Sequence, residues 1–527
     1  MISYPPSYGG IYVISDIHLG GRRDSQENFQ IFNRGERLGN LIRHITEQRR
    51  EEDIALILNG DIIDSLAEKN VPGYVALDRG TAERMMVHMF DDPSFKPVWD
   101  GLTYFIGKEK RHLVFIVGNH DIELSLPVVE HYIRRRLAEN NGNAESRIHF
   151  ATHGSGFTCS VAGAQVFCTH GNEVDEWNCV DYNLLSQLAN AINAGRTVEQ
   201  SKWKPNAGTR LVIDVMNKIK RDHPFVDVLK PETAAVASIL LALNKNVFKD
   251  INLEDAFPIL RDKIRGSLIT KNLLGAEATD LAKVPTEEIA NEAAEQLLGP
   301  SFLDAVNEKR TGGRYTSEDD LLRNAEKAIE GAASTEDVEA SERSPETLGL
   351  WDMITGWVGL VPKPEALRRA LKDWLKDDRS FDVDNIDDTL FEDMKDRAGN
   401  NIDFVVTGHT HKPRALCFSG NRYYYNCGTW IRTLRLTKEV LDDQEAFEKS
   451  VWPALNSRLM DALDNAMIPG PNGTTVPLLF DRTNVVRISA RGKSAVGELF
   501  RVTDDIQGKT VKLDPEPGTS QFKVEKA

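Results

Sequence analysis

The chain has 527 residues, of which 41% are apolar and 27% charged, a composition that excludes a collagen-like chain, a disulfide miniprotein and a wholly disordered tail. Its formal net charge of −16 opposes non-specific binding to nucleic acid or anionic lipid unless basic residues gather locally. No apolar run approaches the roughly 20 residues that span a bilayer, the first residues lack a signal-peptide pattern, and the 5 cysteines mostly lie in apolar runs. We therefore expect a cytoplasmic protein with reduced thiols and no stable membrane insertion.

Up to about residue 180, apolar runs typical of buried strands alternate with segments of helical period. The strand-like runs lack the polar alternation of a half-exposed strand, and they are 11–15, 54–61, 112–118 and 164–169. Apolar groups three and four apart, as in helices that cover a sheet, occur in 36–50, 80–90 and 127–140. This part of the sequence predicts an α/β sandwich.

Strand character returns only at 403–409, which is followed by 414–418 and 422–426. We therefore assign the core to residues 1–180 and 400–435, and we expect 181–399 to form a large helical insertion. Within it, 313–347 is small, polar and acidic, which favours a mobile linker. Residues 436–527 are expected to add a helix and strands that complete or flank the core.

Side chains that bind metals follow each of the strongest predicted strands. In chain order they are Asp16 and His18, then Asp61, then Asn119, His120 and Asp121, then His170, and finally His409 and His411. Ligands of open α/β sheets gather beyond the carboxyl ends of the strands, so we expect these clusters to converge. The Asp-x-His and His-x-His spacings would put both side chains on one side of an extended backbone. Mixed carboxylate and imidazole ligands suit Mn, Fe or Zn better than Mg or Ca.

The motifs SDIHLG, NGDIID, VGNHD, THGNE and TGHTH occur in the order of the five signature blocks of the calcineurin-like metallophosphoesterase superfamily, which they resemble. The resemblance implies a metallophosphoesterase-type β-sandwich flanked by helices, with the large helical insertion between the fourth and fifth blocks. It also implies one metal held by Asp16, His18 and His411, a second held by Asn119, His170 and His409, and a bridging Asp61. His120 would be the catalytic histidine, and Asp121 would orient its ring.

Three further assignments stay open. His153 also follows an apolar run, but His170 is preferred for the fourth block because its strand run is longer and GNEVD follows it. Arg22 and Arg23, just beyond the first block, are the candidates for contacting a substrate phosphate, with an ordinary exposed loop as the alternative. Segment 201–222 holds six basic and two acidic residues, which could attract a nucleotide or a nucleic-acid end or could form a solvated helix face.

The resemblance predicts two divalent metal ions, with Mn preferred and Fe, Zn or Mg as alternatives, and hydrolysis of a phosphate ester by a metal-bound hydroxide. Phosphodiester cleavage is favoured over phosphomonoester cleavage. A nucleotide, a nucleic-acid strand and a lipid-linked pyrophosphate remain as substrates. The alternative is a non-catalytic scaffold of the same fold that binds a protein partner, for which the helical insertion offers a surface.

Overall fold

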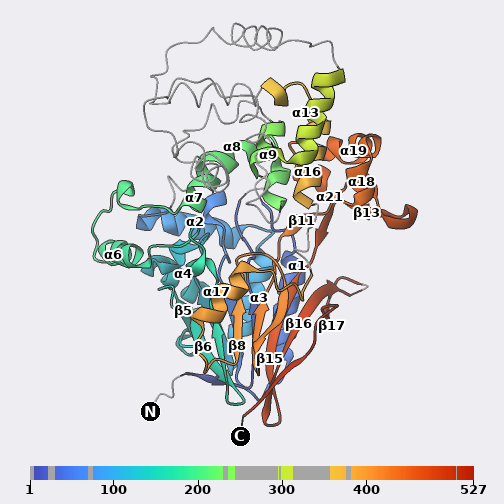
Figure 1. Cartoon of the computed structure of the whole chain (residues 1–527). Coiled ribbons are helices and arrows are strands. Elements are labelled where there is room, and N and C mark those ends of the chain that lie inside the picture. Colours follow the sequence, from blue (N-terminus) through green and yellow to red (C-terminus); the bar gives the residue numbers. More distant parts are fainter. Residues whose placement is uncertain are drawn as a thin grey trace, which may run out of the picture.

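The computed structural model describes residues 5–21, 30–68, 75–229, 236–243, 295, 298–312, 356–375, 382–505 and 507–526. Two β-sheets pack against each other, and helices cover them on the outside (Figure 1). The prediction of a domain of mixed α/β sheets and helices is therefore confirmed. The predicted mobile linker, 313–347, lies outside the described residues.

The larger sheet is eight-stranded and contains the first three strand-like runs of the sequence. Its parallel strands are β2 (Gly10–Ile14), β3 (Ile54–Asn59), β4 (Arg111–Ile116) and β5 (Ile148–Ala151). On the other side of β2 it continues in antiparallel strands, namely β15 (Asn484–Arg491), β16 (Ser494–Asp504), β17 (Val511–Pro515) and β18 (Phe522–Glu525). The C-terminal strands thus complete this sheet.

The second sheet is six-stranded, in the order β1-β6-β7-β8-β10-β9. The bounds are β1 (Ser7–Tyr8), β6 (Phe157–Val161), β7 (Ala164–Cys168), β8 (Phe404–Thr407), β10 (Arg422–Asn426) and β9 (Arg414–Ser419). Parallel pairing of β7 with β8 places Val166 beside Phe404. The strand before the fourth motif therefore lies next to the strand before the fifth, although they are far apart in the sequence.

Successive side chains of the central strands enter different cores, which explains the missing polar alternation. Leu56 and Leu58 of β3 pack against helices, whereas Ile57 packs between the sheets with Val166 and Phe404. The covering helices are α1 (Gly35–Glu47), α2 (Arg79–Asp91), α3 (Lys96–Ile106) and α4 (Pro127–Ala138). Three of them match the predicted helical segments, and α3 was not predicted.

A further hydrophobic core joins helices from two distant parts of the sequence. We call these helices together the helical cap. The cap combines α9 (Val236–Leu243), α13 (Pro300–Gly312) and α16 (Lys363–Leu375) with α18 (Lys438–Asp442), α19 (Gln444–Ser450), α20 (Trp452–Leu455) and α21 (Met460–Asp464). Figure 1 shows it at the end of the molecule opposite both termini. Residues 438–464 therefore pack with helices of the 181–399 segment rather than directly completing the sandwich.

The remaining described elements of the 181–399 segment are also helical. They are α6 (Tyr182–Asn193), α7 (Ala207–Arg210), a π-helical turn (Leu211–Met216), α8 (Asn217–Lys220) and α17 (Thr389–Arg397), with short 3₁₀ turns. Two small ribbons, β11 (Arg432–Leu434) with β14 (Leu479–Asp481) and β12 (Met467–Pro469) with β13 (Thr475–Pro477), link the cap to the sandwich. Among the described residues, no helix is long and apolar enough to cross a membrane.

Candidate metal centre

The predicted ligand residues occupy the turns that follow five strands, three in one sheet and two in the other. Asp16 and His18 follow β2, Asp61 follows β3, and Asn119 follows β4. His170 follows β7, and the paired histidines follow β8. Because the carboxyl ends of these parallel strands meet at one edge of the sandwich, turns from both sheets face each other there.

The backbone at the ligand positions differs from our expectation. The φ angles of Asp16, His18, Asp61, His409 and His411 are 53°, 55°, 51°, 69° and 59°, all in the left-handed region that non-glycine residues seldom adopt. The assumption of an extended backbone in the Asp-x-His and His-x-His motifs was therefore wrong. Such conformations cluster at functional sites, where the surrounding structure holds them in place.

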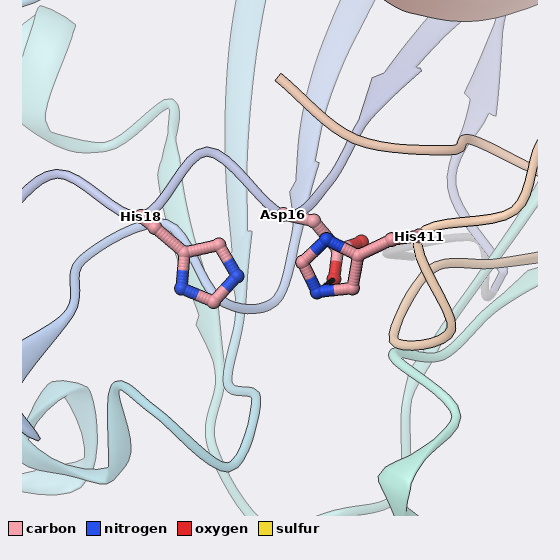
Figure 2. Close-up of side chains that lie close together, drawn as sticks. All are labelled: Asp16, His18 and His411. Carbon is pink, nitrogen blue, oxygen red and sulfur yellow. Dashed lines mark ion pairs between the residues drawn. The ribbon is translucent and has the colours of Figure 1, made fainter. Parts of the chain in front are cut away.

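The first ligand group contains Asp16, His18 and His411 (Figure 2). One potential ligand atom from each lies within 4.8 Å of those of the other two. His411 Nε2 is 3.4 Å from Asp16 Oδ1, and the rings of His18 and His411 stack with centroids 5.2 Å apart. All three side chains are buried. The first and last motifs therefore meet, as expected.

The second group contains Asp61, His170 and His409, with ligand atoms again within 4.8 Å of one another. His170 Nε2 is 3.2 Å from Asp61 Oδ2, and the same carboxylate oxygen is 3.9 Å from His18 Nε2 in the first group. Asp61 thus lies between the two groups. Asn119 is buried, and its Oδ1 has no hydrogen-bond partner among the described residues.

Neighbouring groups determine which imidazole nitrogen can act as a ligand. The Nδ1–H of His170 donates to the carbonyl oxygen of Asn59 at 2.9 Å, which leaves Nε2, the nitrogen that faces Asp61, as the potential ligand atom. The Nε2–H of His409 donates to Asp175 at 2.8 Å, which leaves Nδ1 as its potential ligand atom. Burial favours a higher pKa for Asp175, but the bond from His409 outweighs it and lowers the pKa to about 2. Sequence reasoning did not single out Asp175, although it lies within the GNEVD run.

His120 contacts a different carboxylate from the one we expected. Its Nδ1 is 3.2 Å from Asp64 Oδ1, and Asp64 Oδ2 is 3.7 Å from His18 Nδ1. The carboxylate of Asp121 instead accepts from the N–H groups of Ile62 at 2.7 Å and Gly118 at 2.6 Å, so it braces two motif turns. Asp64 is the second aspartate of the NGDIID motif, and its place in that motif was the sequence signal that could have identified it.

The electrostatics of the site favour positive charge. Burial favours a lower pKa for His170, but the negative charges of Asp61 and Asp16 outweigh it and raise the pKa to about 10. Burial favours a higher pKa for Asp61, but the charges of His170 and His120 hold it well below its usual range. Buried carboxylates of this kind require a compensating cation.

Unsatisfied polar atoms show that the residues fit divalent metals. Among the described residues, no hydrogen-bond partner exists for either ring nitrogen of His18, for His170 Nε2 or for Asn119 Oδ1, and all are buried. Buried polar atoms without partners are rare and costly. A set of imidazole nitrogens, carboxylates and an amide oxygen is the donor set of Mn, Fe or Zn sites.

Two motif glycines permit the close packing of these turns. A Cβ atom on Gly118 would lie 2.1 Å from Asp61 Oδ1, and one on Gly408 would lie 2.4 Å from Asp16 Oδ2. Neither distance is sterically allowed, so larger residues would displace a ligand. The glycines in VGNHD and TGHTH therefore serve the site by the absence of a side chain.

The structure bears on two of the three assignments that the sequence left open. His153 is exposed, whereas His170 is fully buried within the second group. Arg22 and Arg23 lie outside the described residues. In the basic segment 201–222, Lys220 is buried in an ion pair with Asp227, so it is not available as an exposed phosphate contact.

Comparisons with known proteins agree with this geometry. The family model for the calcineurin-like phosphoesterase matches residues 10–229, which include the first four motifs. Neither curated proteins nor solved structures gave a match. The fifth motif lies beyond the matched range, but the structure brings its histidines into the two ligand groups. Residues 10–229 are therefore a calcineurin-like phosphoesterase domain by sequence comparison.

Proposed function

We propose that the protein is a dinuclear metal-dependent phosphoesterase that cleaves phosphodiesters in preference to phosphomonoesters. The observation that carries this proposal is the position of Asp61, whose Oδ2 lies 3.2 Å from His170 Nε2 and 3.9 Å from His18 Nε2. One carboxylate between two groups of nitrogen and oxygen donors is the arrangement that a pair of cations requires.

Each cation has a defined set of residues in this proposal. Asp16, His18 and His411 would hold the first, Asn119, His170 and His409 would hold the second, and Asp61 would contact both. When bound, such a pair polarises the phosphoryl oxygens and lowers the pKa of water at the site. Mn is the preferred metal, with Fe, Zn or Mg as alternatives, because the donors are mixed nitrogen and oxygen.

His120 acts as the general acid in the proposed reaction. Its side chain is 20% exposed, whereas the ligands around it are buried, so a substrate can approach its ring. Donation from Nδ1–H to Asp64 would leave Nε2 as the nitrogen that carries the proton for the leaving oxygen. Protonation of a leaving alkoxide by a histidine is a common route to phosphate-ester cleavage near neutral pH. Asp64 is the positioning residue for this step, and Asp121 acts on the backbone.

The 181–399 segment is proposed to select the substrate. Asn217 of α8 donates to the carbonyl oxygen of Leu66 at 3.0 Å, which places the 181–399 segment against the turn that carries Asp64. Segments beside strand ends commonly decide which substrate reaches an α/β site. We therefore treat 181–399 as a helical insertion that joins 438–464, with 1–180, 400–435 and the C-terminal strands as the catalytic core. A nucleotide, a nucleic-acid strand and a lipid-linked pyrophosphate remain the candidate substrates.

A cytoplasmic location is part of the proposal. All five cysteines are free, and Cys159, Cys168 and Cys427 are buried. Thiols of this kind persist in a reducing compartment.

The test compares the wild type with His120→Ala and Asp61→Asn, each supplied with Mn. The substrates are bis-p-nitrophenyl phosphate, p-nitrophenyl phosphate, cyclic nucleotides and oligonucleotides. We expect both variants to lose at least about 100-fold in kcat. His153→Ala, which changes an exposed histidine, serves as the matched control and should retain activity. A protein that binds Mn but hydrolyses none of these esters would favour the scaffold alternative.

A further inference from the structure

Thr429 makes three hydrogen bonds at the first ligand group through one buried hydroxyl. Its Oγ1 lies 3.1 Å from the carbonyl oxygen of Asp16, 3.2 Å from the backbone nitrogen of Ile431 and 3.0 Å from His411 Nδ1. The residue is 3% exposed and lies in the turn after β10. It therefore touches two of the three residues that would hold the first cation.

The donor and acceptor roles follow from the chemistry of the partners. A hydroxyl has one proton and two acceptor lone pairs. The carbonyl of Asp16 can only accept, so it takes the hydroxyl proton. The N–H of Ile431 can only donate, so it uses one lone pair. The remaining lone pair must accept from His411, which requires the proton of that ring to be on Nδ1.

This arrangement leaves His411 with its Nε2 lone pair towards Asp16 Oδ1, at 3.4 Å. The same hydroxyl bonds to the backbone of Asp16, whose φ of 53° is unfavourable for an aspartate. The backbone N–H of Trp430 also donates to the Asp16 carbonyl, at 3.0 Å. The turn after β10 therefore keeps one hydrogen bond to Asp16 if the hydroxyl of Thr429 is removed.

We propose that Thr429 is a positioning residue that fixes the tautomer of His411 and the placement of Asp16, and so creates the first cation site. This inference rests on the proposed function, because it assumes that the two ligand groups bind cations. Groups that hold the second nitrogen of a ligand histidine usually change metal affinity by about 10- to 100-fold when they are removed.

The experiment titrates metal-stripped protein with Mn by calorimetry and records the melting temperature of the metal-free form. Thr429→Val removes the hydroxyl at nearly constant shape, and Thr429→Ser retains it. Thr433→Val is the matched control, because this threonine is also buried and in the same stretch, but its hydroxyl donates to the carbonyl oxygen of Phe480, at 3.3 Å. The wild type is expected to bind two Mn ions.

We expect Thr429→Val to weaken one of the two Mn sites by about 10- to 100-fold and to leave the other unchanged. Thr429→Ser should stay within about threefold of the wild type, and Thr433→Val should bind like the wild type. Two tight sites in Thr429→Val would overturn the inference, as would equal losses in the serine and valine variants. If the wild type bound no Mn, the proposed function itself would fail.

A second comparison covers the case in which Thr429→Val does not fold, as its melting curve would reveal. Mn is titrated into His411→Gln and into the double variant His411→Gln/Thr429→Ala. The loss of Mn affinity that Thr429→Ala causes in this background is compared with the loss that it causes in the wild-type background. Once His411 has been replaced, we expect Thr429→Ala to weaken Mn binding by less than about a further twofold, because the two residues act as one unit. Fully additive losses would mean that Thr429 does not act through His411.

Discussion

His409 and His411 are separated by one residue, yet they belong to different ligand groups. His411 lies with Asp16 and His18, whereas His409 lies with Asp61 and His170. Both have left-handed backbone conformations, with φ of 69° and 59°. An extended backbone would have directed the two rings to the same side. The fifth motif thus contributes to both halves of the proposed centre.

Asp64→Asn should lower kcat at least tenfold while KM stays within about threefold. The substitution weakens the acceptor at 3.2 Å from His120 Nδ1, which positions the general acid, and leaves the substrate contacts in place. Steady-state kinetics on bis-p-nitrophenyl phosphate measure both constants. Asp121→Asn is the comparison, because it replaces an acceptor of two backbone N–H groups. We expect that variant mainly to lower the melting temperature. If the kinetic loss followed Asp121 instead, the assignment of Asp64 would be wrong.

Removal of divalent metals should lower the melting temperature, and added Mn should restore it. A ligand that binds only the folded state at 100 times its Kd stabilises that state by about 2.7 kcal/mol. His170→Ala should reduce the response to Mn because this ring is fully buried in the second group. His153→Ala should respond like the wild type. Differential scanning calorimetry with chelator and with graded Mn measures the effect, and an identical response in His170→Ala would contradict it.

Gly118→Ala should disrupt the site although it adds one methyl group. The new Cβ would lie 2.1 Å from Asp61 Oδ1, so either the carboxylate or the VGNHD turn must move. We expect at least a 100-fold loss of kcat/KM, together with weaker Mn binding, since a small misplacement of reacting groups is costly. Gly142→Ala is the matched control because its Cβ would have no neighbour within 4 Å. Normal Mn affinity in Gly118→Ala would show that the turn adapts.

Glu123 should make the metal-free protein less stable as the pH rises. Burial is the main cause that raises its pKa from 4.5 to about 7 in the folded state. The folded state therefore binds more protons than the unfolded state between these values, so stability falls as pH increases through this window. Glu123→Gln should flatten the fall in melting temperature between about pH 4.5 and 7. Glu139→Gln, on an exposed residue, should retain the wild-type dependence, and a fall in Glu123→Gln as steep as that of the wild type would refute the assignment.

The sequence alone determined the strands and the residues at their ends. Apolar runs such as 54–61 are buried on both faces, and this burial leaves a plain signal in the order of residues. Motif order also identified the residues that now form the two ligand groups. Strands were also expected within 436–527, and 484–491 and 494–504 form strands of the larger sheet.

Only the tertiary structure decided how those residues are used. Sequence spacing carries no information about positive φ angles that packing imposes, so it predicted an extended backbone where His409 and His411 are left-handed. It could not choose between Asp64 and Asp121 for His120, because both carboxylates follow strand ends and the choice depends on distances across the sandwich. It could not show that 438–464 packs with helices from the 181–399 segment. Those contacts join side chains that are remote in sequence, and only the folded chain brings them together.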